Sequence, residues 1–366
     1  MEVIPPVITQ SIRPELGPFF DIEKLLNLSN GAVILDLGST DAFYRWKDVS
    51  PQKTDLEKSV RSGRVIPVNP DAFSDFGSNH VFLHSTLMQG RFPIIPTITR
   101  FDQLMGKPLP MHEQIQTLGN YSPQVIPGVY VHKKSGPEFS HGGKGVSVIR
   151  EGQVNPFKMK PLYEFIQPFI IPPADETRQW FVRDTRVMLV GGKAVAGVTR
   201  RAEEPLSIAM LKGKALPGEA NYPTATRPGK IEEPSAELWA KVSAHAENIA
   251  AFLSGKLSSY PNRLHSPFST QGYFSMDFLQ DSTGQLLPVD YDLQPMVRPQ
   301  IMDAVSTALA ENMVRLAKQG SQRREIIVIG EPTRDIVLAV LGKLYDSKYP
   351  QDKIAWQDYK EFYQLD

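Results

Sequence analysis

The chain has 366 residues, with 40 Lys and Arg against 40 Asp and Glu, 7 His and no Cys. The balanced charge argues against a protein held mainly by nucleic-acid phosphates, and the lack of cysteine excludes disulfides, iron–sulfur clusters, thiolate zinc sites and a cysteine nucleophile. No apolar run reaches the roughly 20 residues that span a bilayer, and the first residues lack the pattern of a signal peptide. We therefore expect a cytoplasmic protein without a membrane or nucleic-acid partner.

The first part of the chain mixes strands and helices. The apolar run 31–38 is bounded by glycines and predicts a buried strand, and residues 78–89 predict a helix. β-branched and aromatic residues predict strands over 125–132 and 146–149. The glycine-bearing segment 133–145 between them indicates a hairpin.

A second hairpin follows. The alternating runs 185–190 and 193–201 flank Gly191-Gly192, and a two-residue Gly-Gly link is a strong hairpin signal. Residues 203–234 are rich in proline and show little periodicity, which predicts a long loop. Loops of this length in a compact domain are usually functional or mobile, so this one could close over a ligand.

The last part of the chain begins with the clearest helix. Apolar residues recur at helical spacing over 235–257, and Ser235 can cap the first turn. A third hairpin is predicted from strands 272–279 and 285–293. The remainder, 301–366, predicts two helices around a short strand and a polar helix at the end.

The third hairpin carries three carboxylates. Asp290 and Asp292 are two apart on a strand, so they point to one face. A turn centred on residues 282–283 would place Asp277 opposite Pro288 and on that same face. Such acids are tolerated in water, as a solvated face of a sheet, or when a cation neutralises them. All-oxygen ligation favours magnesium before calcium or a transition metal.

This hairpin resembles the metal-binding end of the ATP-grasp superfamily, in which a strand Asp, a turn and Glu-x-Asn precede a proline. The resemblance implies that Asp277, Asp290 and Asp292 hold the Mg2+ ions that bridge the phosphates of ATP. Here Asp290 and Asp292 stand where Glu and Asn are usual, and the added charge leaves the number of ions open. The implied cofactors are ATP and Mg2+.

The resemblance also implies a fold and the boundaries of its domains. The expected class is α/β (α+β), with two lobes clamping ATP, a small N-terminal α/β domain and a C-terminal helical extension. The expected division is 1–90 for the N-terminal domain, 91–165 for the small lobe, 166–300 for the large lobe and 301–366 for the mostly helical extension.

Two further segments, 128–134 and 141–146, resemble the strand with the nucleotide lysine and the glycine-rich phosphate loop of that superfamily. Lys133 would contact phosphate and adenine, with the following lysine, 134, as the alternative register. Gly142 and Gly143 would let backbone amides approach phosphate closely. An earlier lysine of the family is absent, and His80 is the residue that could replace it.

The adenine and ribose contacts are implied by segments 165–170 and 184–201. The former resembles the linker between the lobes, where Gln167 and the backbone near Phe169 and Ile170 would meet adenine. Asp184 would contact ribose. The alternatives are that Gln167 lies on a helix surface and that Asp184 only begins a strand.

Three arginines complete the implied site. Arg186 and Arg200 resemble the catalytic arginines of the glutamate-ligase branch and would face phosphates or an acyl phosphate; Arg200 and Arg201 could also be an exposed strand end. Arg298 is expected to bind an acidic substrate, since arginine holds carboxylates bidentately, although it could be a surface arginine.

The resemblance implies an ADP-forming ligase that joins a carboxylate to an amine through an acyl phosphate, using ATP and Mg2+. Its substrates would be a small-molecule or peptide carboxylate and an amine acceptor. The alternatives are a small-molecule kinase of the same superfamily and a non-catalytic nucleotide-binding protein. Oligomeric state stays open.

Overall fold

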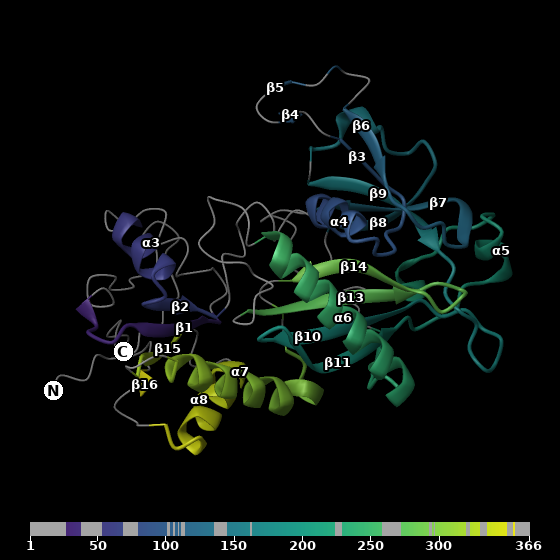
Figure 1. The fold of residues 1–366 in the computed structure, drawn as a ribbon. Coiled ribbons are helices and arrows are strands. Elements are labelled where there is room, and N and C mark those ends of the chain that lie inside the picture. Colours follow the sequence, from purple (N-terminus) through teal and green to yellow (C-terminus); the bar gives the residue numbers. More distant parts are fainter. Residues whose placement is uncertain are drawn as a thin grey trace, which may run out of the picture.

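The computed structural model describes most of the chain. The described residues are 27–37, 53–68, 80–100, 103–104, 107–108, 110, 114–134, 145–161, 163–223, 229–257, 272–292, 295, 297–319, 323–329, 335–349 and 354–355. The predicted phosphate-loop glycines, Gly142 and Gly143, and the predicted polar helix at the end of the chain lie outside these residues. The described residues form one parallel sheet, two five-stranded antiparallel sheets and a two-stranded antiparallel ribbon, together with helices (Figure 1), which confirms the mixed α/β class.

The parallel sheet is formed by segments from both ends of the chain. Its order is β16-β15-β1-β2, and β1 runs parallel to both of its neighbours. Its strands are β1 (Ala32–Asp36), β2 (Val65–Pro67), β15 (Glu325–Ile329) and β16 (Ile354–Ala355), and its helices are α3 (Lys53–Arg61), α7 (Met302–Ala317) and α8 (Asp335–Asp346). The glycine-bounded apolar run is thus the buried strand that was predicted, whereas its pairing with the tail was not predicted.

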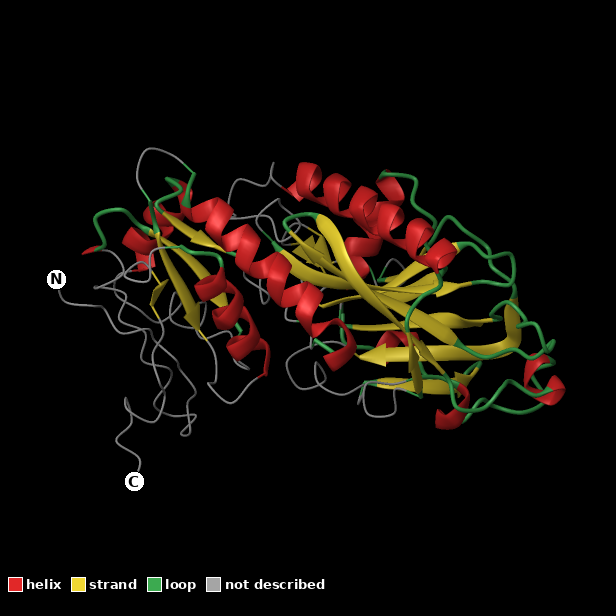
Figure 2. Cartoon of the chain, turned by 90° about the horizontal axis from the view of Figure 1, so that it is seen from below, coloured by secondary structure: helices red, strands yellow, loops and turns green. Residues whose placement is uncertain are grey.

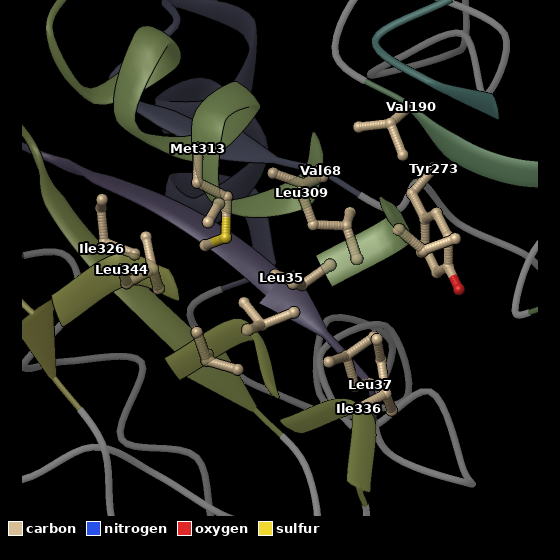
Figure 3. Packing of buried hydrophobic residues seen from close by; sticks show 14 of the residues in the cluster. Leu35, Leu37, Val68, Val190, Tyr273, Leu309, Met313, Ile326, Ile336 and Leu344 are labelled. Atoms are coloured by element: carbon tan, nitrogen blue, oxygen red, sulfur yellow. The ribbon is translucent and has the colours of Figure 1, made fainter. Parts of the chain in front are cut away.

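Helix α7 connects this sheet to the rest of the molecule. Figure 3 shows Leu35 and Ile326 of the parallel sheet near Leu309 of α7, with Val190 and Tyr273 of an antiparallel sheet on the other side. All five belong to one continuous buried apolar cluster. Because α7 buries residues toward both sheets, it joins the parallel-sheet unit to the neighbouring lobe.

The first antiparallel sheet, here called the small lobe, has the order β6-β3-β9-β7-β8. Its strands are β3 (Thr97–Arg100), β6 (Ile115–Leu118), β7 (Val125–Lys134), β8 (Val146–Arg150) and β9 (Glu164–Ile170). Strands β7 and β8 pair as the predicted hairpin. The short pieces β4 (Gln103–Leu104), β5 (Lys107–Pro108) and η2 (Pro156–Lys158) lie outside this sheet.

The second antiparallel sheet, here called the large lobe, has the order β12-β11-β10-β13-β14. Its strands are β10 (Arg183–Val190), β11 (Lys193–Arg201), β12 (Lys230–Glu232), β13 (Tyr273–Gln280) and β14 (Leu286–Asp292). The turn between β10 and β11 is formed by Gly191 and Gly192, whose φ angles of 60° and 79° suit glycine. Helices α6 (Ala236–Leu257) and α4 (His80–Gln89) pack on one apolar face of this sheet (Figure 2).

The register of the third hairpin differs from the prediction. Asp277 lies opposite Asp290, not Pro288. The turn centres on residue 283, which moves the pairing by one residue, and a shift between Asp277 and Phe278 adds the second. Phe278 pairs with Pro288, so Val289 is the extra residue of a β-bulge. An alternating pattern alone does not reveal this bulge.

The predicted long loop, 203–234, is more ordered than its sequence indicates. Its described part contains α5 (Ile208–Leu211), η3 (Glu219–Asn221) and strand β12. Leu206 and Met210 pack against Ile126 and Val129 of the small lobe in one apolar cluster. The described part therefore rests on the small lobe, and its closure over a ligand remains a prediction. Within the described helices, none is long and apolar enough to cross a membrane.

Candidate functional site

Charged side chains gather on the face of the large-lobe sheet that lies opposite α6. Residues directly opposite each other in antiparallel strands point to the same face. The register pairs Asp184 with Arg200, Arg186 with Asp277, and Asp277 with Asp290. The pairing therefore places all five side chains, which come from four strands, on one face.

Asp277 is the centre of this cluster and is 3% exposed. Arg186 donates from Nε to Oδ1 at 2.8 Å and from Nη2 to Oδ2 at 3.0 Å. Arg200 donates from Nη2 to Oδ2 at 2.7 Å. Burial alone would raise the pKa of Asp277, but the two guanidinium groups hold it well below its usual range. The carboxylate is therefore ionised and held by both arginines.

Arg200 also binds Asp184, the predicted ribose contact. Its Nε donates to Oδ1 at 2.7 Å, and its Nη2 donates to Oδ2. Arg200 is only 8% exposed, so it is not an exposed strand end. Asp184 lies inside β10 and is equally buried, so it does more than begin a strand. In this structure the Asp184 carboxylate orients Arg200.

The two acids of β14 are more accessible than Asp277. Asp290 and Asp292 are half-buried, and Arg186 Nη1 lies 3.5 Å from Asp292 Oδ2. Asp290 Oδ1 accepts a hydrogen bond from the Tyr291 backbone N–H at 3.0 Å. Across the described ranges, no group of three or more His, Asp or Glu side chains is arranged to hold a metal ion.

The expected set of three metal ligands is thus divided. Both oxygens of Asp277 bind guanidinium groups, whereas Asp290 and Asp292 remain next to each other on one face of β14. Magnesium is commonly bound by one or two carboxylates together with substrate phosphates. Asp290 and Asp292 fit that smaller requirement.

Lys133 reaches this cluster from the other lobe. Its Nζ donates to the Val289 carbonyl at 2.8 Å, so a side chain of β7 bonds to the backbone of β14. The same Nζ lies 5.8 Å from the centre of the Phe165 ring. Burial lowers the pKa of Lys133, and the nearby carboxylates of Asp290, Asp277 and Asp184 oppose that shift. Lys134, the alternative register, lies on the opposite face of β7, across from Glu164.

The three predicted linker residues lie in β9. Gln167 is 2% exposed, and its Nε2 donates to Thr97 Oγ1 at 2.9 Å, so it is not on a helix surface. The side chain of Phe169 packs in the apolar cluster that the small lobe shares with the described part of segment 203–234. Ile170 packs against Leu287 of β14. Gln167 thus bonds within the small lobe, whereas Ile170 packs against the large lobe. The contact of this backbone with adenine remains a prediction.

Arg298 directly precedes η4 (Pro299–Ile301), a short turn that leads into α7 and lies against β11, the strand of Arg200. It is half-buried, and burial together with the positive charges of Arg200 and Arg186 lowers its pKa. The side chain of His80 is outside the described part, although its backbone begins α4.

Some residues of this region were not predicted. Ser275 lies opposite Asp292 and is fully buried, and its Oγ has no hydrogen-bond partner within the described residues. The sequence signal for Ser275 is its position two residues before Asp277, because residues two apart on a strand share a face. Tyr121 and Asp281 form a hydrogen bond between the lobes, and no local pattern in the sequence indicates that pair.

Comparison with known proteins gives similarity only at the level of three-dimensional structure. No family model matches the chain. No curated protein matches it either. The chain is similar to the ATP-grasp ligase PsnB complexed with a minimal precursor, with 11% identity, 73% of this chain and 72% of that chain covered, and a TM-score of 0.36.

Two more solved structures show similarity of the same order. D-cycloserine synthetase DcsG is 10% identical over 78% of this chain and 98% of that chain, with a TM-score of 0.41. The macrocyclase MdnC from Microcystis aeruginosa MRC, bound to the precursor peptide MdnA, is 12% identical over 76% and 73%, also with a TM-score of 0.41. The chemistry assigned to this chain below rests on its own residues.

Proposed function

We propose that this chain is an ATP-grasp enzyme that uses ATP and Mg2+ to join a carboxylate to an amine with formation of ADP. The observation that supports this proposal most directly is the Lys133–Val289 contact, which brings a lysine of one lobe over the acids of the other. A phosphate chain bound there would meet Lys133 on one side and Arg186 and Arg200 on the other. Such a site suits a dense anionic transition state.

The arginines are held ready to bind an anion. Arg200 uses Nε and Nη2 to bind its two aspartates, which leaves the Nη1 hydrogens for a phosphate oxygen. Arg186 is held by Asp277 through two parallel hydrogen bonds. Because buried aspartates fix both guanidinium planes, little side-chain entropy remains to be lost when an acyl phosphate binds.

Asp290 and Asp292 are the residues that would hold Mg2+. When bound, the ion would neutralise charge on the phosphates. The role of Asp277 in this arrangement is to fix Arg186 and Arg200. Lys133 would exchange the Val289 carbonyl for a phosphate oxygen, which it binds better because the pair is ionic.

Arg298 is proposed to bind the carboxylate substrate. It is half-buried beside the other two arginines, and a carboxylate on it would lie near the transferred phosphate. The substrate would be a small-molecule or peptide carboxylate, and an amine acceptor would displace phosphate from the acyl phosphate. No covalent protein nucleophile is needed in this reaction.

The proposal is tested by calorimetric titration with ATP, with and without Mg2+. Wild-type protein is compared with the double variant Asp290→Asn/Asp292→Ala, and with Glu311→Gln, an exposed acid of α7, as the matched control. We expect Mg2+-dependent binding in the wild type and the control, and its loss in the double variant. A wild type that does not bind ATP at millimolar concentrations would contradict the proposal.

A second assay separates ligation from the other activities of such a site. With candidate carboxylates and amines present, a ligase releases free phosphate together with ADP. A product that retains the phosphate would identify a kinase. ATP binding without turnover on any substrate pair would identify a nucleotide-binding protein without catalysis.

A further inference from the structure

The two lobes are joined by a polar contact that the proposed chemistry does not use. Tyr121 belongs to the segment between β6 and β7 of the small lobe, and Asp281 directly follows β13 of the large lobe. Their positions are 160 residues apart, yet the Tyr121 hydroxyl donates to Asp281 Oδ2 at 2.5 Å. The same hydroxyl lies 3.4 Å from Thr283 Oγ1.

Asp281 is a rigid acceptor. Its residue is fully buried, and its other oxygen, Oδ1, accepts hydrogen bonds from Thr283 N at 2.9 Å, Thr283 Oγ1 at 2.7 Å and Gln285 N at 3.0 Å. These bonds fix the turn of the β13–β14 hairpin. One carboxylate oxygen therefore holds the turn while the other faces Tyr121. The bond to Tyr121 couples the whole hairpin to the small lobe.

Tyr121 is also fixed on its own side. Its backbone N–H donates to the Ile94 carbonyl at 3.2 Å, and Ile94 N–H donates to Asn120 Oδ1 at 2.8 Å. Its ring packs against a buried cluster that includes Leu287 and Val289 of β14. Val289 is the residue whose carbonyl binds Lys133. Strand β14 thus meets the small lobe at two neighbouring points.

We propose that Tyr121 is a positioning residue whose hydroxyl sets the angle between the lobes and so keeps Asp290 and Asp292 beneath Lys133. This inference rests on the proposed function for its purpose, but the positioning itself is a property of the protein without nucleotide. Removal of the hydroxyl leaves the ring in the apolar cluster, so the lobes stay in contact but lose their fixed angle.

The test measures the distance between the lobes directly. Because the chain has no cysteine, Ser147→Cys on β8 and Ala244→Cys on α6, both at exposed positions, can carry a pair of spin labels. Distances are measured by pulsed electron resonance without nucleotide, in the otherwise unchanged protein and with Tyr121→Phe. Tyr130→Phe, on β7, is the matched control.

We expect Tyr121→Phe to add a longer or broader population of distances between the labels. Its melting temperature should stay within a few degrees of that of the parent protein. Tyr130→Phe should leave the distance distribution unchanged. An unchanged distribution in Tyr121→Phe, or an equal change in Tyr130→Phe, would overturn the inference.

A kinetic readout links this position to nucleotide binding. The dissociation rate of a fluorescent ATP analogue, measured by displacement with excess ATP, should rise about tenfold in Tyr121→Phe, as expected for loss of a hydrogen bond to a charged acceptor. An unchanged rate in a protein that does bind the analogue would overturn the link. If the parent protein binds no nucleotide, the proposed function fails, and the distance measurement alone decides whether Tyr121 sets the lobe angle.

Discussion

The two faces of the large-lobe sheet are built from the same strands and serve opposite purposes. Met276 is fully buried in the apolar cluster beneath α6, whereas Asp277, the next residue, is buried among guanidinium groups. On the apolar face, removal of apolar surface from water stabilises the folded state. On the charged face, bidentate hydrogen bonds must offset the cost of removing charges from water. Equal burial therefore has different causes on the two faces, so substitutions at neighbouring residues should destabilise the protein in different ways.

The largest effect is expected at Asp277. Asp277→Ala would leave Arg186 and Arg200 buried without their shared anion, and loss of one partner of a buried ion pair costs about 3–5 kcal/mol. We expect the free energy of unfolding in urea to fall by this amount. Asp346→Ala, at the exposed end of α8, is the control and should leave the midpoint unchanged. A small loss at Asp277 would mean that water or a bound anion satisfies the arginines.

On the apolar face, Met276→Ala tests the other half of the comparison. Truncation of a buried methionine typically costs about 2–5 kcal/mol, because transfer free energy is lost and a cavity remains. At temperatures where the variant is folded, ATP binding measured by calorimetry should equal that of the wild type. A tenfold loss of affinity would show that the two faces are coupled and would weaken the distinction drawn between them.

A smaller effect is expected for Arg186→Lys. Lysine keeps the charge but cannot make the two parallel bonds to Asp277, so the free energy of unfolding should fall by about 2 kcal/mol. Nucleotide affinity should fall as well, since the ammonium group is not held in place. Arg323→Lys, at an exposed position, is the matched control. Equal stability of the two variants would show that the bidentate geometry at Asp277 contributes little.

The sequence was sufficient to predict the hairpins of this sheet and most of the charged cluster. Alternation placed Asp290 and Asp292 on one face, and the Gly191-Gly192 turn located the hairpin of β10 and β11. The direct pairing of Arg200 with Asp184 also depends on a register shift after Met188, which the sequence did not indicate. These features depend on spacing within one or two neighbouring strands. That is the range over which period and turn chemistry constrain a structure.

Contacts between distant segments could not be predicted in this way. The bulge at Val289, the pairing of β1 with β15 and the bond between Tyr121 and Asp281 each depend on how separate elements pack. The sequence also predicted repulsion among three acids and a cation to relieve it. It did not show that Arg186 and Arg200 already neutralise Asp277, because their approach requires the full sheet.

The smallest effect on the free energy of unfolding should come from the titration of Asp277 as the pH is lowered. The arginines hold its pKa below the value of about 3.9 expected in the unfolded chain, against the opposing influence of burial. Its contribution to stability is therefore complete above that value and is lost as the pH falls toward the folded-state pKa. Burial raises the pKa of Asp184, with Arg200 opposing, so Asp184 does not add to this loss.

The difference in unfolding free energy between the wild type and Asp277→Asn should be constant from about pH 7 to pH 5 and should shrink below about pH 4. Urea denaturation at each pH measures it, and a difference that stays constant to about pH 3 would mean that Asp277 is not held as an anion by the two arginines.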